Sequence, residues 1–384
     1  AQNIALWTDY LARHGDAELS ELGEQAPAAG QWRSAAVLNR SGELTELLSS
    51  QAPQRVHGQQ ALNETSTTFL FPGGGAQYVQ MGRDLYERFP VFRKVVDEGL
   101  ALYHARTGYD LRRVWFPRPE LEAACELELE RPSVQLPAIF IAELALARLW
   151  MHWGVQPDAL IGHSMGENTA ACVSGVLSFP DALGLVTLRG QLFERVEAGG
   201  MLSVALSAEA AEAYMGDELE LATVNGPEQC TLTGRQKPLE AARRKLEQDG
   251  VDCQVIPIAI AAHSRWLDPI LQEFGDYLRS VELRAPTIPI ISNRSGTWLS
   301  EAEARDPEYW VGHLRNTVRF ADGVKTLLES PQRVYLECGP GKILGSLVKH
   351  QAQHLSSRVI PSLRHPREET SDLSFLLDTL GKLW

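Results

Sequence analysis

Residues 159–166 read Ala-Leu-Ile-Gly-His-Ser-Met-Gly, a short apolar strand that runs into a tight glycine turn. An alanine-rich helix follows, to about Val176. A serine on a sharp turn between a strand and a helix is typical of the G-x-S-x-G nucleophile elbow of α/β enzymes. The small glycines permit the turn, and the helix N-terminus favours negative charge on the Ser164 oxygen. The alternative is that Ser164 only caps its helix.

The same order of strand, glycine turn and helix occurs earlier in the chain. Residues 67–71 read as a buried strand, Pro72-Gly73-Gly74-Gly75 stops it, and a helix is predicted over residues 81–89. From Gly200 to Ile258 the pattern changes to strand, helix, strand, strand, helix, strand, which is the ferredoxin-like order. Alternation of helices and strands then resumes. We therefore predict an α/β fold: a large α/β-hydrolase-like subdomain with a parallel sheet, an inserted ferredoxin-like βαββαβ small subdomain, and flanking linker regions.

Composition excludes several classes of protein. The 384 residues carry 36 Lys and Arg against 49 Asp and Glu, a formal charge of −13. Such an acidic balance argues against a nucleic-acid-binding protein. The longest apolar stretch, about 136–155, is interrupted by Glu143, Arg148 and His152, so we expect a buried helix and no membrane span.

Cysteine usage and the start of the chain bear on its compartment. The five cysteines are odd in number, widely spread and without a C-x-x-C, which fits neither a disulfide framework nor a zinc site. We expect no metal and a reducing, cytoplasmic location. The chain begins at Ala1 with no signal-peptide pattern, and we expect it to be cut from a longer protein.

A serine nucleophile needs a base, and the sequence offers ten histidines. Three late ones, His350, His354 and His365, lie in a basic stretch that we expect to be solvated. His263 differs because it follows the last strand of the small subdomain and directly precedes a helix. The pattern leaves open whether His263 is the base or a structural histidine.

Arg189 and the glycine loop after residue 72 are two further candidate parts of the site. Arg189 is a lone cation after an apolar run, so it pairs either with an acidic substrate group or with a carboxylate of the protein. The loop 73–77 is no nucleotide loop, because Tyr78 breaks G-x-G-x-x-G. Its backbone N–H groups, with that of Met165, can form an oxyanion hole, although an ordinary turn remains the alternative.

Several motifs in fixed order resemble the acyltransferase domain of modular polyketide synthases, which is related to malonyl-CoA:acyl carrier protein transacylases of fatty-acid synthesis. They are Phe71-Pro72-Gly73-Gly74-Gly75-Ala76-Gln77, Gly162-His163-Ser164-Met165-Gly166-Glu167, Arg189, Ala261-Ala262-His263-Ser264, Val318-Arg319-Phe320 and Glu337-Cys338-Gly339-Pro340-Gly341. The resemblance implies five segments. These are a ketosynthase-to-acyltransferase linker (1–66), a large subdomain in two parts (67–197 and 260–352), the ferredoxin-like subdomain (198–259) and a post-acyltransferase linker (353–384).

The resemblance also implies a mechanism. Ser164 would be the nucleophile and His263 its base, in ping-pong covalent catalysis that moves a malonyl extender unit from CoA to an acyl carrier protein. Arg189 would bind the free carboxylate of the extender unit, and the N–H groups of Gly74 and Met165 would hold the oxyanion. A backbone carbonyl, which we place at Arg319, would orient the histidine.

The same resemblance implies partners and a substrate. The domain would bind no cofactor of its own. It would use malonyl-CoA or a substituted malonyl-CoA, meet phosphopantetheine on the carrier protein, and work beside the ketosynthase and other domains of one synthase, with no nucleic acid or membrane as partner.

The residues expected to select the extender unit depart from the common family patterns. Malonyl-selective domains read His-Ala-Phe-His and methylmalonyl-selective ones Tyr-Ala-Ser-His, whereas this chain reads Ile260-Ala261-Ala262-His263. Met165 is apolar, as is usual for the residue after the serine in malonyl-selective domains, while the small Ala262 leaves room for an α-methyl group. We expect malonyl, with methylmalonyl or another substituted malonyl as the alternative.

Two basic clusters are either solvated faces or a docking surface for an acidic carrier protein or the CoA phosphates. They comprise Arg235, Lys237, Arg243, Arg244 and Lys245, and Lys342, Lys349, His350, Arg358 and Arg364. Two rival functions stay open. A serine hydrolase or phospholipase with the same elbow would need a catalytic Asp, and a non-enzymatic docking domain would need no intact Ser164, His263 and Arg189.

Overall fold

The computed structural model describes residues 32–37, 56–60 and 65–383, which fall into two units. In one unit, β1 (Trp32–Ala36) and β2 (Val56–Gln60) form an antiparallel pair, and residues 373–383 belong to α18 (Asp372–Leu383). Most of the predicted linker 1–66 lies outside the described residues. The other unit, Ser66–Asp372, contains everything described from here on.

A five-stranded parallel sheet forms the centre of this unit, in the order β11-β10-β3-β4-β9. Its strands are β3 (Ser66–Phe71), β4 (Ala159–Gly162), β9 (Ile290–Ile291), β10 (Arg333–Glu337) and β11 (Val359–Pro361). All the pairs run parallel, so the carboxyl ends of neighbouring strands meet at one edge. Phe71 pairs with Gly162, and the loops after β3 and β4 therefore leave the sheet side by side.

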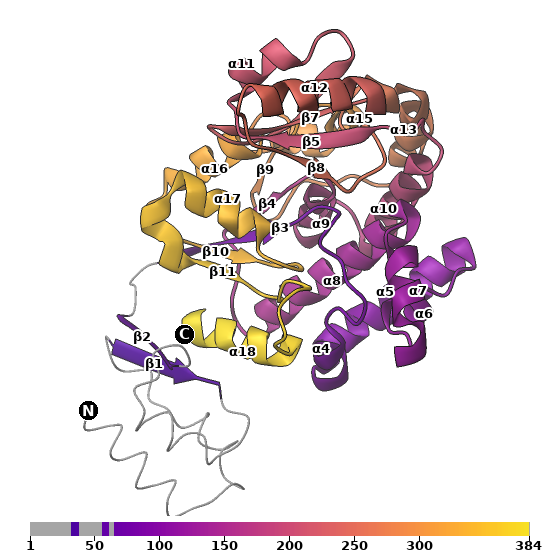
Figure 1. Ribbon diagram of the computed structural model, residues 1–384. Coiled ribbons are helices and arrows are strands. Elements are labelled where there is room, and N and C mark those ends of the chain that lie inside the picture. The colour runs from indigo at the N-terminus through magenta and orange to yellow at the C-terminus, as the bar shows by residue number, and fades with distance from the viewer. Residues whose placement is uncertain (1–31, 38–55, 61–64, 384) are drawn as a thin grey trace, which may run out of the picture. The chain divides into compact units, whose positions relative to one another are not determined.

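Helices cover both faces of the sheet (Figure 1). One face packs against α16 (Phe320–Leu328) and α17 (Ile343–Gln351), through a core that includes Ile161, Ile291 and Tyr335. The other helical segments are α4 (Arg83–Arg88), α5 (Pro90–Thr107), α6 (Leu111–Trp115), η2 (Pro119–Leu121), α7 (Glu122–Leu129), α8 (Pro132–His152), α9 (Met165–Val173), α10 (Phe179–Phe193), η4 (Arg265–Ile270), α13 (Leu271–Ser280), α14 (Glu301–Ala304), α15 (Pro307–Arg315) and η5 (Gln353–Arg358).

The long apolar helix predicted near residue 145 is α8. Its length and composition would allow it to cross a membrane, but 83% of its apolar window is buried inside the protein. Glycines bring its neighbours close: a Cβ at Gly99 of α5 would lie 2.7 Å from Ile141, and one at Gly190 of α10 would lie 2.3 Å from the Pro132 carbonyl oxygen. α8 is a core helix of this unit.

The small subdomain is a four-stranded antiparallel sheet in the order β6-β7-β5-β8. Its elements are β5 (Gly200–Val204), α11 (Ala208–Ala211), η3 (Glu212–Tyr214), β6 (Leu219–Gly226), β7 (Gln229–Gly234), α12 (Gln236–Gln248) and β8 (Cys253–Ile256). Leu232 and Leu246 belong to its separate core. The βαββαβ order and the parallel sheet confirm the predicted fold class.

Some boundaries differ from the sequence prediction for physical reasons. The strand expected over 288–291 pairs only at Ile290 and Ile291, because Pro289 has no N–H to donate to the ladder. The helix expected over 208–215 ends as an α-helix at Ala211 and continues as a 3₁₀ turn.

The contact between α10 and α8 predicts the effect of a single methyl group. Gly190→Ala should lower the free energy of unfolding by about 1–3 kcal/mol, because the added Cβ meets the rigid Pro132 carbonyl. Urea denaturation measures the change. Gly226→Ala is the matched control, since its Cβ would meet only Gln229 at 3.5 Å, an ordinary contact. Equal stability of both variants would contradict the tight α8–α10 packing.

Candidate active site

The turn between β4 and α9 places Ser164 in a strained backbone conformation. Its φ of 54° and ψ of −116° lie where residues with a side chain are rarely found. Glycine is required on both sides: a Cβ at Gly162 would lie 2.0 Å from the Glu167 nitrogen, and one at Gly166 would lie 2.0 Å from the Phe71 oxygen. The sequence thus builds an elbow that presents the serine hydroxyl at the carboxyl edge of the sheet.

His263 lies beside this serine. Its Nε2 is 2.7 Å from Ser164 Oγ, and its Nδ1 is 3.0 Å from the Asn316 carbonyl oxygen. A carbonyl can only accept, so Nδ1 carries the proton and Nε2 is free to accept the serine proton. Burial, and after it the positive charge of Arg189, lowers the pKa of His263 to about 3. The imidazole is therefore neutral at physiological pH, as a general base must be.

The carbonyl that orients His263 was expected at Arg319, and that prediction is wrong by three residues. Arg319 precedes α16, and its carbonyl accepts the Gly323 N–H of the first helical turn. Asn316 follows the end of α15, where carbonyls lack helical partners, so its oxygen can bind the histidine. The Arg319 side chain instead pairs with Asp322.

Arg189 reaches the serine from α10. Its Nη2 donates to Ser164 Oγ at 2.8 Å and its Nη1 to Asn168 Oδ1 at 3.2 Å, while its buried Nε has no partner. Only 2% of the residue is exposed. Burial lowers the pKa of this guanidinium to about 9, and the negative charge of Glu167 acts in the opposite direction.

Arg189 forms no salt bridge with any residue that the structure describes. The alternative left open by the sequence, a protein carboxylate as its partner, is therefore not seen among those residues. A buried, unpaired cation is costly unless an anion joins it. This position next to the nucleophile suits an acidic ligand.

Met165 and Gly74, whose N–H groups are expected to form the oxyanion hole, lie in adjoining parts of the chain. Met165 is the first residue of α9, and the loop after β3 runs alongside, because a Cβ at Gly73 would lie 2.9 Å from the His163 carbonyl oxygen. Gly74 follows in this loop and packs against the Gln135 side chain. The sequence had given no role to Gln135.

The three residues expected to set specificity are all buried. Met165 is 1% exposed, and Ile260 and Ala262 are 7% exposed each. Ile260 pairs with Ala198 in an isolated bridge, and Thr169 donates to the Met165 sulfur. They are therefore fixed groups in the protein interior near the dyad.

Several polar residues around the dyad were missed by the sequence reasoning. Asn293 and Tyr309 contact Glu167, and Asn225 of the small subdomain contacts His163. Burial raises the pKa of Glu167 to about 7. Glu167 and His163 stand in the elbow motif, but nothing in the sequence pattern marks Asn225, Asn293 or Tyr309.

The two basic clusters are largely neutralised within the described residues. Arg243 and Arg244 pair with Glu240, and Arg243 also pairs with Glu247. Arg235 pairs with Glu197. In the second cluster Lys342 pairs with Glu368, Arg364 pairs with Asp372, and Arg358 donates to a backbone carbonyl. These pairs favour the interpretation as solvated faces.

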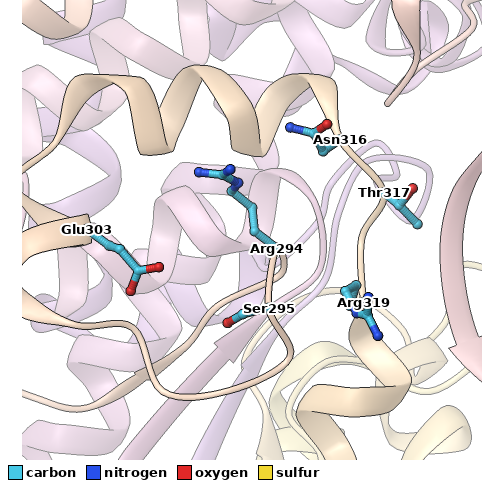
Figure 2. Close-up of a pocket in the computed structure, with 6 residues that line it drawn as sticks. All are labelled: Arg294, Ser295, Glu303, Asn316, Thr317 and Arg319. Atoms are coloured by element: carbon cyan, nitrogen blue, oxygen red, sulfur yellow. The ribbon is translucent and has the colours of Figure 1, made fainter.

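A cavity of about 390 Å³ lies next to Asn316. Figure 2 shows Asn316 at the end of one helix and Arg319 at the start of the next, with Arg294 and Ser295 on a facing loop. The described residues hold no cluster of side chains suited to a metal ion.

Comparison with known proteins gives consistent matches. A family profile described as "Acyl transferase domain" matches residues 68–382. A phenolphthiocerol/phthiocerol polyketide synthase protein of Mycobacterium tuberculosis is 35% identical over 317 residues, or 82% of this chain and 21% of that protein. The chain thus spans about a fifth of that relative's length.

Two solved structures resemble the whole chain. The acyl transferase domain of ZmaA has a TM-score of 0.91 and 33% identity, over 98% of this chain and 88% of that one. The acyl transferase domain of SpnD, in complex with 2-(pent-4-yn-1-yl)malonyl, has a TM-score of 0.88 and 34% identity, over 100% and 92%.

The low pKa of His263 predicts how serine reactivity depends on pH. An uncharged sulfonyl fluoride should label Ser164 at a nearly constant rate from about pH 8 to about pH 5, because His263 stays neutral there. Intact mass measures the labelling. In Arg189→Ala the rate should begin to fall at a higher pH, since the cation that disfavours imidazolium is gone. A midpoint near the ordinary histidine pKa of about 6.5 in the wild type would contradict this geometry.

Proposed function

Because the chain belongs to the acyl transferase domain family, in the form found in polyketide synthases, we propose that it loads malonyl onto Ser164. The donor is malonyl-CoA, and the acceptor is the phosphopantetheine thiol of an acyl carrier protein. The observation that carries this proposal is Arg189: its buried guanidinium, which has no carboxylate partner among the described residues, donates to the nucleophile itself. A malonyl thioester bound there brings its free carboxylate to Arg189 and its carbonyl to Ser164.

The first half-reaction acylates the serine. Ser164 Oγ attacks the thioester carbonyl while His263 Nε2 takes the hydroxyl proton, and the N–H groups of Gly74 and Met165 hold the oxyanion. The tetrahedral intermediate collapses, the C–S bond breaks, and CoA leaves as a thiol with the proton from His263. Asn316 keeps Nδ1 protonated throughout.

The second half-reaction reverses the roles. The phosphopantetheine thiol gives its proton to His263 and attacks the acyl-serine, after which the C–O bond breaks and Ser164 recovers its proton. The same base serves both halves, because each half begins with a neutral imidazole and a protonated nucleophile.

The proposed choice of extender unit rests on two buried residues near the dyad. Met165 favours malonyl, whereas Ala262 is small enough to admit an α-substituent, and one methyl group is worth only about 1–3 kcal/mol of discrimination. The SpnD domain, one of the similar structures, is in complex with a substituted malonyl. Methylmalonyl or a larger malonyl is therefore the second candidate.

A serine hydrolase is disfavoured by the partner of His263. That rival needs an acidic residue at Nδ1, and this position is taken by the Asn316 carbonyl. We also propose that the chain works beside the ketosynthase and carrier domains of one synthase. The proposed location is the cytoplasm, where its five free cysteines remain reduced.

Intact mass after brief incubation with equal amounts of malonyl-, methylmalonyl- and acetyl-CoA tests the substrate. We expect a malonyl adduct that is absent from Ser164→Ala. Arg189→Ala should reduce malonylation at least about 100-fold while leaving acetylation nearly unchanged, because only malonyl has a carboxylate to lose. A methylmalonyl adduct would reverse the specificity, and an acetyl adduct on the wild type as abundant as the malonyl adduct would remove the carboxylate role of Arg189.

The lifetime of the malonyl-enzyme tests transfer against hydrolysis. Isolated acyl-enzyme should persist in buffer and lose its acyl group rapidly when a carrier protein bearing phosphopantetheine is added, with the acyl group recovered on the carrier. The carrier protein without phosphopantetheine is the control, since it has no acceptor thiol. Fast release that ignores both carriers would favour the hydrolase.

A further inference from the structure

Asn293 lies two residues after the end of the two-residue strand β9 and is 2% exposed. Both polar atoms of its side-chain amide, its backbone N–H and its backbone carbonyl form hydrogen bonds with residues close to Ser164 and His263. Oδ1 accepts the Ser164 N–H at 2.8 Å, and Nδ2 donates to the Gly162 carbonyl at 2.7 Å. Its backbone N–H donates to Glu167 Oε2 at 2.6 Å, and its carbonyl accepts the Arg319 N–H at 2.7 Å.

The side-chain amide of Asn293 continues the hydrogen bonding to β4 beyond the end of strand β9. β9 pairs with β4 only at Leu160 and Ile161, so the ladder ends just before the elbow. The Asn293 amide then takes the place of a backbone peptide, since it offers one acceptor to Ser164 N–H and one donor to Gly162 C=O. These two groups flank the strained turn, and the pair of bonds holds that turn to the sheet edge.

The backbone of Asn293 holds the other half of the dyad. The Arg319 N–H that it accepts lies three residues after Asn316, whose carbonyl orients His263. On one side this connection is bordered by the 390 Å³ cavity, so packing does not support it there (Figure 2). Val318 and the Thr317 hydroxyl hold the connection to β6, and the bond from the Arg319 N–H to the Asn293 carbonyl holds its other end to the segment after β9.

We propose that Asn293 is a positioning residue that sets the distance between Ser164 Oγ and His263 Nε2. It fixes the nucleophile through its side chain and the carbonyl behind the base through its backbone. The proposal rests on the proposed function in one respect, namely that this pair transfers the serine proton.

The side chain at position 293 must offer one acceptor to the Ser164 N–H and one donor to the Gly162 carbonyl. Alanine leaves the Ser164 N–H and the Gly162 carbonyl without partners. An ionised carboxylate accepts from Ser164 but faces the Gly162 oxygen with a second acceptor, which is repulsive. A protonated carboxyl has one acceptor and one donor in the same plane, and it matches the amide.

The test compares Asn293→Ala and Asn293→Asp with wild type and with Ser295→Ala, an exposed neighbour outside the dyad. Labelling of Ser164 by an uncharged fluorophosphonate reports serine reactivity without any acyl-CoA. At neutral pH both Asn293 variants should be labelled about 100-fold more slowly, the effect of a misplaced reacting group. Their kcat for malonyl transfer should fall similarly, with KM unchanged, and Ser295→Ala should match the wild type.

The pH dependence separates positioning from a general structural role. Burial and the Gly162 carbonyl raise the pKa of the carboxyl introduced by Asn293→Asp, so lowering the pH from about 8 to about 5 should protonate it and restore labelling toward wild type. Asn293→Ala should show no such recovery. The titratable and charged groups nearby are Glu167 on α9, Arg189 on α10, His263 before η4, Arg294 after β9, and Tyr309 and His313 on α15. They are present in every variant, and Asn293→Ala shows how their own titration changes labelling when no carboxyl has been introduced.

Two results would overturn the proposal. Labelling of both variants within about threefold of wild type would show that the amide does not position the dyad. Equal loss in both variants at every pH, with thermal unfolding temperatures near wild type, would show that the hydrogen-bond pattern is irrelevant. A wild type that is labelled by fluorophosphonate but not acylated by malonyl-CoA would defeat the proposed function alone, because the labelling comparison stays valid.

Discussion

The geometry of this protein depends on how closely the turn after β4 packs against the end of β3. A Cβ at Gly166 would lie 2.0 Å from the Phe71 carbonyl oxygen, so no other residue type fits without moving the strand. This approach leaves Ser164 at positive φ and sends its hydroxyl toward His263 and Arg189. Close backbone packing at the sheet edge therefore shapes the turn that presents the nucleophile.

The electrostatics of the site depart from those of an ordinary protein interior. A positive guanidinium lies beside a neutral imidazole, and within the part of the chain that the structure describes the charged neighbour that favours the guanidinium is Glu167, whose own pKa is about 7. Such an arrangement weakens the free protein, because a buried charge lacks compensation. An anion that binds there pairs with the guanidinium and gains the favourable free energy that the free protein lacks. The lower stability of the free protein thus contributes to the affinity for the anion.

Much of the site could be read from the sequence because its chemistry depends on local patterns. The elbow needs two glycines at fixed spacing, and Ser164, His263 and Arg189 each stand in a recognisable local setting. Asn293 and Asn316 act through long-range contacts, and nothing in their neighbourhood records those contacts. The wrong prediction that the Arg319 carbonyl orients His263 has the same cause. The choice between the carbonyls of residues 316 and 319 depends on where α15 ends and α16 begins, which the sequence pattern does not give. The acidic residues that pair with the two basic clusters likewise could not be identified from the number of charged residues in the sequence.

The small subdomain is inserted between the two parts of the large subdomain, and the chain delivers His263 only after β8 is complete. Ser164 and His263 are 99 residues apart in sequence, and Asn316, whose carbonyl contacts His263 Nδ1, is 53 residues further on. During synthesis the serine thus emerges long before the histidine. A chain that ends before residue 263 carries the serine without its histidine, and one that ends before residue 316 lacks the carbonyl that binds this histidine. The complete Ser–His arrangement therefore cannot exist until the whole small subdomain and the chain through Asn316 have been made.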